Sequence, residues 1–510
     1  MLVAPTFHYM GNYPSFLSLS DFPSGLAYIA ASLKRAGHEV YGVNPNNITG
    51  YVNAKYMIQD VLTKKIKEVQ PELIGLGGLC IDYTFLRDTI AIVRREDSKI
   101  PIVLGGQIVS NDAEFIFDDL KPDYAIVGEA DNAIVELVNI LSNKVQPEPF
   151  IMKATTPDLD TLPLPDYEPF GVNEMLDKFS MSTRVLYRYP RPYPRPFSIV
   201  TSRSCPFACS FCVHGHERPK YRARSIENVM EEIRVTYEKY NFNILIILDE
   251  LFAVHKKRMN EFCKALIEGK ERFGWDFDWM FQTHANARLD AGSLKLAKEA
   301  GCFTFSYGLE SASPAVLKSM NKKIKVEQVI EVMDLAREAK IGFGGNLIFG
   351  DIAETEETIA ESLSFWLRYC GDNFVFLGNL MPYPGSKLFK DIREKGMLPD
   401  KKEYYENIDK AAPNMTQMSN GTLTSFLTLI KFLEETWLFV KSAKDVHYEL
   451  EDSEFCKLWA ECPYCGETSM YRVGTVAQKP PPALGLACIH CNRKIKVDVP
   501  NGAKVEAIYG

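Results

Sequence analysis

The chain has 510 residues, of which 46% are hydrophobic and 24% are charged, and its formal net charge is -8. This length indicates two to four domains, and the composition is that of a soluble globular protein. The acidic balance argues against general nucleic-acid binding, which needs a basic face.

The start of the chain lacks the basic and apolar regions of a signal peptide, and no run approaches the roughly 18 apolar residues of a membrane span. We therefore expect a cytoplasmic protein. In that compartment the twelve cysteines are expected to be metal ligands and thiols rather than disulfides.

Strand-like and helical segments alternate through residues 1–148, which predicts an α/β domain with helices on both faces of a parallel sheet. The predicted strands are 2–4, 39–43, 73–76, 102–104 and 124–126, and the predicted helices are 25–36, 56–69, 85–95 and 130–141. Such sheets bind ligands at the carboxyl ends of their strands. Glycines gather there and allow a ligand to approach the backbone, although glycine also serves ordinary turns.

Four segments then carry a resemblance: Phe22-Pro-Ser-Gly-Leu-Ala-Tyr-Ile-Ala-Ala, Ala36-Gly-His-Glu-Val, Leu104-Gly-Gly and Tyr124-Ala-Ile-Val-Gly-Glu129. Their order is similar to that of the cobalamin-binding domain found in front of many radical S-adenosylmethionine (SAM) enzymes. The resemblance implies a Rossmann-like domain in which cobalamin contacts Ser24, Gly77, Gly78, Leu79, Gly105, Gly106, Gln107, Gly128 and Glu129.

One departure from mutase-type cobalamin domains concerns the cobalt ligand. Their Asp-x-His-x-x-Gly signature is absent, and Asn44-Pro-Asn-Asn47 stands in its place. The resemblance therefore implies a cobalamin held without a protein histidine. The alternative is a degenerate domain that binds no cobalamin.

Proline-rich sequence after residue 147 predicts an extended linker over residues 149–196. Its last part, from Arg184 to Phe197, interleaves arginines, tyrosines and prolines. This part either wraps the next domain as a polyproline-like segment or lines a substrate entrance that meets an anionic or aromatic ligand.

Cys205, Cys209 and Cys212 form a C-x3-C-x2-C array on the loop after a predicted strand. Three thiolates can hold three corners of a [4Fe–4S] cube and leave the fourth iron open for another ligand. The alternatives are a disulfide pair and a zinc site completed by His214 or His216. With Phe211 before its last cysteine, the array resembles the cluster loop of the radical SAM superfamily, which implies that SAM chelates the open iron.

Residues 197–400 contain six β-then-α units, which predict a partial (βα)6 barrel with its catalytic groups at the carboxyl ends of the strands. The predicted strands are 197–200, 244–248, 279–283, 302–307, 343–349 and 374–380, separated by helices such as 226–240 and 326–340. The segments that follow them resemble, in order, those of the radical SAM superfamily: Asp249-Glu250, Gly308-Leu-Glu-Ser311, Gly344-Gly-Asn-Leu-Ile348 and Met381-Pro-Tyr-Pro.

This resemblance implies SAM contacts from Phe211, Asp249, Glu250, Glu310, Ser311, Asn346 and Ile348. For Asp249 an ordinary helix cap is the alternative. Polar residues at the strand ends are candidates for the substrate pocket: His284, Asn286, Tyr307 and Asn346. Of these, His284 and Tyr307 are the predicted catalytic residues, although a strand-end histidine is often a satisfied structural residue.

Residues 401–454 predict a connector whose helix, 424–443, packs on the barrel wall. In the last module, 455–510, Cys462, Cys465, Cys488 and Cys491 form two C-x2-C knuckles and predict one tetrahedral metal site. Zinc in a ribbon is the default, because it stabilises a module too small to build its own core. A rubredoxin-like iron that relays electrons toward the cluster and an auxiliary Fe–S cluster are the alternatives.

Taken together, the resemblances imply a cobalamin-dependent radical SAM methyltransferase, in which a 5′-deoxyadenosyl radical activates an unreactive carbon and methylcobalamin supplies the methyl group. The alternatives are a radical oxidative cyclase or ring-rearranging enzyme, a radical SAM enzyme with a vestigial cobalamin domain, and a docking factor built on the ribbon. We expect a small-molecule or peptide substrate, an electron donor such as flavodoxin or ferredoxin, and no nucleic acid as the main partner.

Overall fold

The computed structural model describes residues 1–6, 23–48, 50–51, 53–143, 148–180, 186–187, 190–213, 219–408, 410, 412–436, 439–453, 455–475, 480 and 483–499. The chain divides into two compact units, each assembled from distant parts of the sequence. Unit 1 contains residues 1–175, 206–223 and 381–413, and unit 2 contains residues 176–205, 224–380 and 414–510. No described helix is both long and apolar enough to cross a bilayer.

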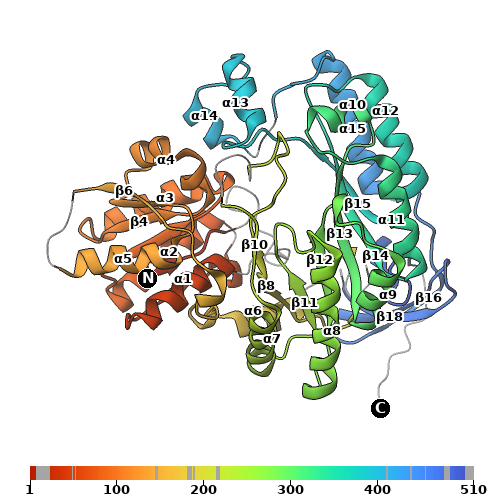
Figure 1. The fold of residues 1–510 in the computed structure, drawn as a ribbon, viewed down its shortest axis with the longest axis horizontal. Coiled ribbons are helices and arrows are strands. Elements are labelled where there is room, and N and C mark those ends of the chain that lie inside the picture. Colours follow the sequence, from red (N-terminus) through yellow and green to blue (C-terminus); the bar gives the residue numbers. More distant parts are fainter. Residues whose placement is uncertain are drawn as a thin grey trace. The chain divides into compact units, whose positions relative to one another are not determined.

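Unit 1 is built on a six-stranded parallel sheet in the order β2-β1-β3-β4-β5-β6. Figure 1 draws this part of the chain in red to orange. Its strands are β1 (Leu2–Val3), β2 (Gly42–Val43), β3 (Ile74–Gly77), β4 (Ile102–Gly105), β5 (Tyr124–Val127) and β6 (Phe150–Lys153). Its helices are α1 (Ser24–Arg35), α2 (Ala54–Val69), α3 (Tyr83–Glu96), α4 (Gln107–Leu120) and α5 (Ala130–Ser142). The predicted parallel α/β fold is confirmed, while α4 and β6 were not predicted; β6 extends the sheet with residues that we had expected in the linker.

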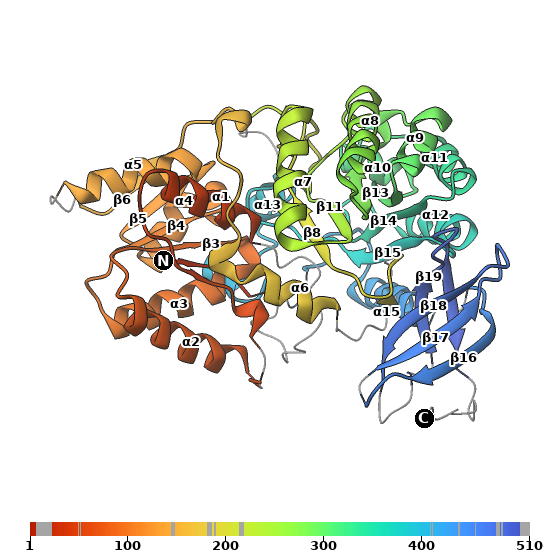
Figure 2. The same cartoon turned by 90° about the horizontal axis from the view of Figure 1, so that it is seen from below.

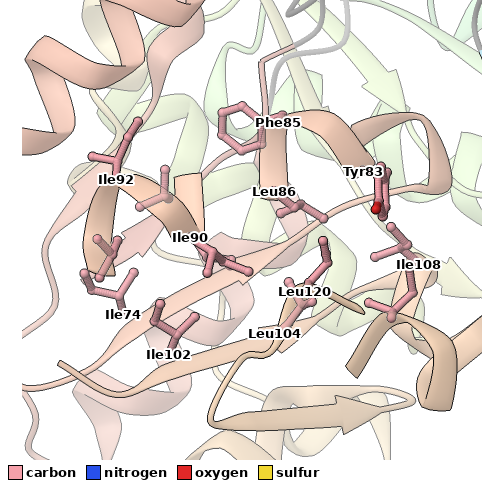
Figure 3. Packing of buried hydrophobic residues seen from close by; sticks show 14 of the residues in the cluster. Ile74, Tyr83, Phe85, Leu86, Ile90, Ile92, Ile102, Leu104, Ile108 and Leu120 are labelled. Atoms are coloured by element: carbon pink, nitrogen blue, oxygen red, sulfur yellow. The ribbon is translucent and has the colours of Figure 1, made fainter. Parts of the chain in front are cut away.

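Apolar residues on both faces of this sheet hold the helices in place. On one face, α2, α3 and α4 pack on the strands, with Ile74, Ile102 and Leu104 fully buried beneath them (Figure 3). On the other face, α1 and α5 pack on Val103 and Ile126. Burying each such aliphatic side chain contributes about 1.5–3 kcal/mol to the free energy of unfolding. The two clusters together form the predicted core on both faces of the sheet.

The segment 381–413 belongs to unit 1 although it follows, in the chain, the last strand of the six-stranded sheet in unit 2. It forms α13 (Lys387–Glu394) and α14 (Lys401–Glu406). The Lys401 ammonium pairs with Asp112 of α4 at 2.6 Å, and the Tyr405 ring lies 5.3 Å from the ring of Tyr83. Charge pairing and aromatic burial together therefore fix this segment on the N-terminal sheet domain.

Unit 2 contains the second parallel sheet, in the order β8-β11-β12-β13-β14-β15. Its strands are β8 (Pro196–Ile199), β11 (Ile244–Ile247), β12 (Asp278–Thr283), β13 (Cys302–Glu310), β14 (Gly342–Phe349) and β15 (Phe374–Asn379). Neighbours in the chain are neighbours in the sheet, and β8 does not pair with β15 among the described residues. The six strands therefore form the predicted partial barrel.

Helices connect these strands, as predicted, and several begin at side-chain caps. They are α7 (Ile226–Tyr240), α8 (Lys256–Phe273), α9 (Ala291–Glu299), α10 (Pro314–Ser319), α11 (Val326–Glu338) and α12 (Glu356–Phe365). The Ser225 hydroxyl accepts a hydrogen bond from the Asn228 N–H at the start of α7, and Asp290 accepts one from Ser293 at the start of α9. The expected connector helix is α15 (Asn420–Thr436), which lies against β15; Trp437 lies outside the described residues.

The four-cysteine module completes unit 2 with two three-stranded sheets (Figure 2). One contains β16 (Lys444–Leu450), β17 (Phe455–Glu461) and β18 (Thr468–Gly474); the other contains β19 (Ala483–Ala487), β20 (Lys494–Asp498) and β7 (Leu186–Tyr187). The module therefore begins before residue 455, and it takes one strand from the expected linker.

The module packs at the amino ends of the barrel strands. Its core includes Ile244, the first residue of β11, and Phe303 near the start of β13. The Asn492 amide donates to the Lys340 carbonyl at 2.9 Å just before β14, and Arg493 pairs with Asp372 just before β15. The module thus closes the end of the partial barrel opposite to the end where catalytic groups are expected.

The described part of the arginine- and tyrosine-rich segment is fixed on unit 2. Arg191 pairs with Asp276 and Asp278, at 2.8 Å and 2.7 Å, and the Tyr193 hydroxyl donates to Glu451 at 2.7 Å. These contacts support the wrapping role rather than a substrate entrance for these residues. Arg184 lies outside the described residues.

Candidate functional site

The carboxyl edge of the sheet in unit 1 is shaped by glycine. Gly106, which is exposed, has a φ of +83°, and a Cβ at this position would lie 2.7 Å from the Gly78 backbone nitrogen. The Ile108 N–H donates to the Gly78 carbonyl at 3.0 Å, so the loops after β3 and β4 touch through their backbones. Side chains at these two positions would clash with the facing backbone or with Asp82, so glycine allows the two loops to approach this closely.

Exposed apolar and buried polar groups lie at the same edge. Leu79 is 47% exposed, and its N–H donates to Asp82 at 2.7 Å, while burial raises the pKa of the Asp82 carboxyl to about 6. The buried hydroxyls of Thr6, at the end of β1, and Ser24, at the start of α1, have no hydrogen-bond partner among the described residues. A backbone cradle at the ends of β3 and β4, with orphaned hydroxyls after the neighbouring β1, fits a large cofactor such as cobalamin.

Glu129, at the end of β5, holds another segment of unit 1. Its carboxylate pairs with Arg222, whose guanidinium also donates to the Pro157 carbonyl at 2.9 Å. Arg222 ends the stretch 206–223 that carries Cys209 and Cys212. The ion pair therefore anchors that stretch on the sheet edge where cobalamin is expected, and the direct cobalamin contact of Glu129 stays a prediction.

The three cysteines of the cluster loop fall in both units. Cys205 belongs to unit 2, whereas Cys209 and Cys212 belong to unit 1, where the Cys212 N–H donates to the Cys209 carbonyl at 3.1 Å. The structure pairs none of the twelve cysteines, all of which are described, in a disulfide. Cys205 and Cys212 are partly exposed and Cys209 is buried, and three thiols within eight residues are a suitable donor set for an iron–sulfur cluster. Phe211, in the same turn, is half-buried.

The residues just before Cys205 are held by Asp249, which follows β11. Its carboxylate is buried and accepts three hydrogen bonds of 2.6 Å, from the Thr201 N–H, the Thr201 hydroxyl and the Ser202 hydroxyl. Burial raises the pKa of Asp249, and these donors oppose that shift. The observed function of Asp249 is thus to fix the start of the cluster loop, and its SAM contact stays a prediction. Glu250, the next residue, is half-buried.

A buried ion pair also holds the segment that leads to Cys205. Arg224 is 4% exposed and pairs with the fully buried Glu232 of α7. Its guanidinium also donates to the Val200 carbonyl at 2.9 Å and to the Asn228 side chain at 2.6 Å. Since Val200 directly follows β8, the strand that leads to Cys205, the pair fixes the backbone from which the cluster loop departs.

The end of β13 carries two predicted SAM contacts. Glu310 follows a β-bulge and has a φ of +68°, and its Oε1 lies 2.9 Å from the Lys322 ammonium. Ser311 is buried, and its hydroxyl lies 3.1 Å from the Ser362 hydroxyl and accepts from the Ser313 N–H. Ser311 therefore shapes this turn, while Glu310 presents a carboxylate oxygen that is free to bind a ligand.

A cavity of about 200 Å³ lies against the amino-terminal halves of β13, β14 and β15. Its lining contains no charged side chain and includes two residues of the four-cysteine module. The lining residues are Met280, Phe303, Thr304, Phe305, Ser306, Gly344, Gly345, Asn346, Phe374, Phe376, Ala487 and Asn492. Asn346 is thus the described SAM or substrate candidate that reaches this cavity; Ile348, two residues further along β14, is half-buried.

The two predicted catalytic residues lie in different surroundings. His284, after β12, is 5% exposed; its Nδ1 accepts from the Asn286 N–H at 3.2 Å, and burial, with Lys322 as a second cause, lowers its pKa to about 3. Tyr307 is fully buried against Phe305 and Phe343, and burial raises its pKa. Its hydroxyl is buried without a hydrogen-bond partner among the described residues, and the catalytic role of Tyr307 stays a prediction.

The four C-terminal cysteines converge. Their sulfurs lie within 4.8 Å of one another, with 3.8 Å between Cys462 and Cys491 and 3.7 Å between Cys465 and Cys488. A tetrahedral ion with metal–sulfur bonds of about 2.3 Å requires sulfur–sulfur distances of about 3.8 Å. The residues therefore fit a four-coordinate metal.

Each pair sits in the same kind of turn. The Gly466 N–H donates to the Cys462 carbonyl at 2.9 Å, and the Asn492 N–H donates to the Cys488 carbonyl at 2.8 Å. Gly466 and Asn492 both have positive φ, +75° and +57°, which only glycine and asparagine adopt readily. The residue after each C-x2-C pair thus closes the knuckle, as the sequence spacing predicts.

Three basic residues of these sites had no role in the sequence analysis: Arg222, Arg224 and Lys322. Each pairs with a carboxylate that lies at a strand end or in a buried helix face. Their immediate sequences contain other charged residues, such as Lys220 and Lys323, so nothing local distinguishes a buried cation from an exposed one.

The comparisons with known proteins agree with this architecture. The model of the Radical SAM superfamily matches residues 199–365, and the model of the B12 binding domain matches residues 22–138. The chain is a member of the radical SAM superfamily that carries a B12-binding domain ahead of its radical SAM domain, and it is an enzyme of that class.

Relatives and solved structures extend the likeness over most of the chain. An uncharacterized methyltransferase of Pyrococcus horikoshii, PH0819, is 27% identical over 387 residues, which cover 72% of this chain and 78% of the relative. The anaerobic magnesium-protoporphyrin IX monomethyl ester cyclase of Cereibacter sphaeroides is 25% identical over 419 residues, 75% of this chain and 62% of the relative. The radical SAM methyltransferase TsrM from Kitasatospora setae, solved with cobalamin and a [4Fe-4S] cluster, shares the fold with a TM-score of 0.58 at 17% identity over 77% of this chain and 74% of that chain.

Proposed function

We propose that the protein is a cobalamin-dependent radical SAM methyltransferase that acts on an unactivated carbon. The observation that carries the proposal is the joint presence of a three-cysteine loop on a six-stranded partial barrel and a glycine cradle on a separate B12-binding sheet. When bound, the cluster with SAM supplies a carbon-centred radical, and cobalamin supplies a transferable methyl group.

The residues of the chain bind and orient these groups. Cys205, Cys209 and Cys212 would hold the cluster, and Asp249 keeps the backbone before Cys205 in place through Thr201 and Ser202. SAM would be bound by Phe211, Glu250, Glu310, Ser311, Asn346 and Ile348, with Asp249 acting through the loop. Cobalamin would lie on the edge formed by Ser24, Gly77, Gly78, Leu79, Gly105, Gly106, Gln107, Gly128 and Glu129.

For the substrate we expect a small organic molecule or a peptide, bound at the carboxyl ends of the barrel strands, where the cluster and SAM would lie. The uncharged cavity beside β13–β15 lies at the amino-terminal halves of these strands and borders the four-cysteine module. It therefore lies away from the strand ends where the radical would form. His284, neutral because of its lowered pKa, would position rather than protonate a substrate near the strand ends.

For the four-cysteine site we propose zinc with a structural role. The sulfur distances and the two closed knuckles support a four-coordinate site with no open position, which is the form of structural zinc sites. The site lies at the amino ends of the barrel strands, whereas Cys205 follows the carboxyl end of β8. This separation argues against an electron relay through the module, so an external donor such as flavodoxin or ferredoxin would reduce the cluster.

Product analysis separates methyl transfer from radical cyclisation, the reaction class that the name of the Cereibacter sphaeroides relative indicates for that protein. The anaerobically reconstituted enzyme is incubated with SAM, cobalamin, a reductant and candidate substrates. Formation of 5′-deoxyadenosine and S-adenosylhomocysteine in step with a product that is heavier by one methyl group supports the proposal. Formation of 5′-deoxyadenosine with product but without S-adenosylhomocysteine would refute it and favour the cyclase class.

A further inference from the structure

Lys322 is a buried cation at the carboxyl end of the barrel strands. It is 6% exposed and follows α10 in a turn whose flanking residues, Asn321 and Lys323, both have left-handed backbones, with φ of +52° and +49°. The Lys322 N–H donates to the Leu317 carbonyl at 2.9 Å and closes that turn. The turn therefore directs one lysine of the Lys322-Lys323 pair inward and leaves the other exposed.

Gly308 makes room for the Lys322 side chain. A Cβ at position 308 would lie 2.6 Å from the Lys322 Nζ and 2.9 Å from the Glu310 Oε1. The ion pair thus lies directly over the backbone of β13, and a larger residue at position 308 would displace the ends of both side chains. Gly308 has an ordinary backbone conformation, so its small size, rather than its flexibility, explains its presence here.

The ion pair with Lys322 uses only one carboxylate oxygen of Glu310. Lys322 binds Oε1 at 2.9 Å, and Oε2 of Glu310, which is 12% exposed, has no hydrogen-bond partner among the described residues. His284, close enough for the Lys322 charge to lower its pKa, is neutral and brings no competing charge. The cation therefore pairs with a carboxylate that keeps one oxygen available.

We propose that Lys322 is a positioning residue for SAM: it holds the Glu310 carboxylate across Gly308 so that the second oxygen is presented to the ribose hydroxyls. This inference rests on the proposed function, which makes Glu310 a SAM contact. A free glutamate side chain loses rotational entropy when it binds a ligand. Because Lys322 already fixes Glu310 in the unliganded protein, this entropic cost is smaller and the affinity for SAM is higher.

SAM itself is the probe, in binding measurements on the anaerobically reconstituted full chain. Lys322→Met removes the charge and keeps the aliphatic stem, Lys322→Arg keeps the charge, and Lys323→Met is the matched control on the exposed neighbour. We expect the Kd for SAM to rise about tenfold or more in Lys322→Met, by less than about threefold in Lys322→Arg, and not measurably in Lys323→Met, with unchanged iron content.

A double-mutant cycle with Glu310→Gln identifies the route of the effect. If Lys322 acts through Glu310, Lys322→Met has little further effect on SAM affinity in the Glu310→Gln background. Equal losses in both backgrounds, or unchanged affinity in folded Lys322→Met, would overturn the inference. Failure of the unmodified, iron-loaded chain to bind SAM would overturn the proposed function itself, so the two failures are distinguishable.

Discussion

Replacing Arg224 with methionine tests whether the buried ion pair of α7 supports the cluster loop. The change leaves the fully buried Glu232 carboxylate without its cation and removes the donor of the Val200 carbonyl. Breaking one side of a buried pair costs about 3–5 kcal/mol. The Val200 carbonyl, left without this donor, places the expected loss toward the upper end of that range.

Urea denaturation followed by tryptophan fluorescence measures this loss in the right part of the molecule. Four of the five tryptophans, Trp275, Trp279, Trp366 and Trp459, are described and lie in unit 2, so their fluorescence reports the unfolding of that unit. Arg234→Met is the matched control, because Arg234 lies on the same helix and pairs with Glu231 and Glu238 at the surface. We expect no measurable change for the control, since exposed pairs contribute little.

The pH dependence gives a second readout. Burial raises the pKa of Glu232, and Arg224 opposes this shift. A carboxyl group whose pKa is higher in the folded state destabilises that state increasingly as pH rises above its unfolded value. The deficit of Arg224→Met should therefore be larger at pH 8 than at pH 5. Equal unfolding midpoints for the Arg224 and Arg234 variants, or a deficit that grows on acidification, would refute the reasoning.

Three further outcomes follow from the geometry of the other sites. Gly106→Val should abolish most cobalamin binding, because its Cβ would lie 2.7 Å from the Gly78 nitrogen at a φ of +83°; spectroscopic titration checks this against Gly421→Ala, and unchanged affinity would contradict the cradle. Cys462→Ser should remove the metal of the four-cysteine site, measured as zinc per chain, while the iron content stays unchanged. Equal loss of zinc and iron would contradict two independent metal sites. His284→Gln should flatten the stability loss on acidification, because a pKa of about 3 in the folded state, against about 6.5 unfolded, gives stability that is present above pH 6.5 and lost as pH falls. A denaturation series from pH 7 to pH 4 measures this, with the exposed His447→Gln as the control, and parallel curves for the chain and His284→Gln would disagree with it.

The sequence predicted the parts of the fold that local pattern encodes. The six barrel strands lie within a few residues of their expected ranges, because a buried parallel strand is a continuous apolar run such as Ile244–Ile247. The two knuckles were predictable because spacing alone brings Cys462 and Cys465 onto one turn. Helix α4 was missed because its first residues, Gln107 onward, follow directly on the glycine turn that we interpreted as a ligand loop.

Long-range pairing was not legible in the sequence. The return of residues 381–413 to the first unit depends on partners such as Asp112, almost 300 positions earlier in the chain. The addition of β7 to the four-cysteine module depends on its register with Gly485 and Leu486. The same holds for the site: the Asp249 carboxylate was recognised as a strand-end group, but its donors, Thr201 and Ser202, lie on another strand end.

The most direct test of the account is the metal and cofactor content of the anaerobically purified protein. Iron, sulfide, zinc and cobalt are measured per chain, with a visible spectrum after cobalamin addition. The account predicts about four irons, one zinc and one bound cobalamin per chain. Iron and zinc without any cobalamin uptake would contradict the methylcobalamin chemistry and leave a radical SAM enzyme with a vestigial B12-binding domain.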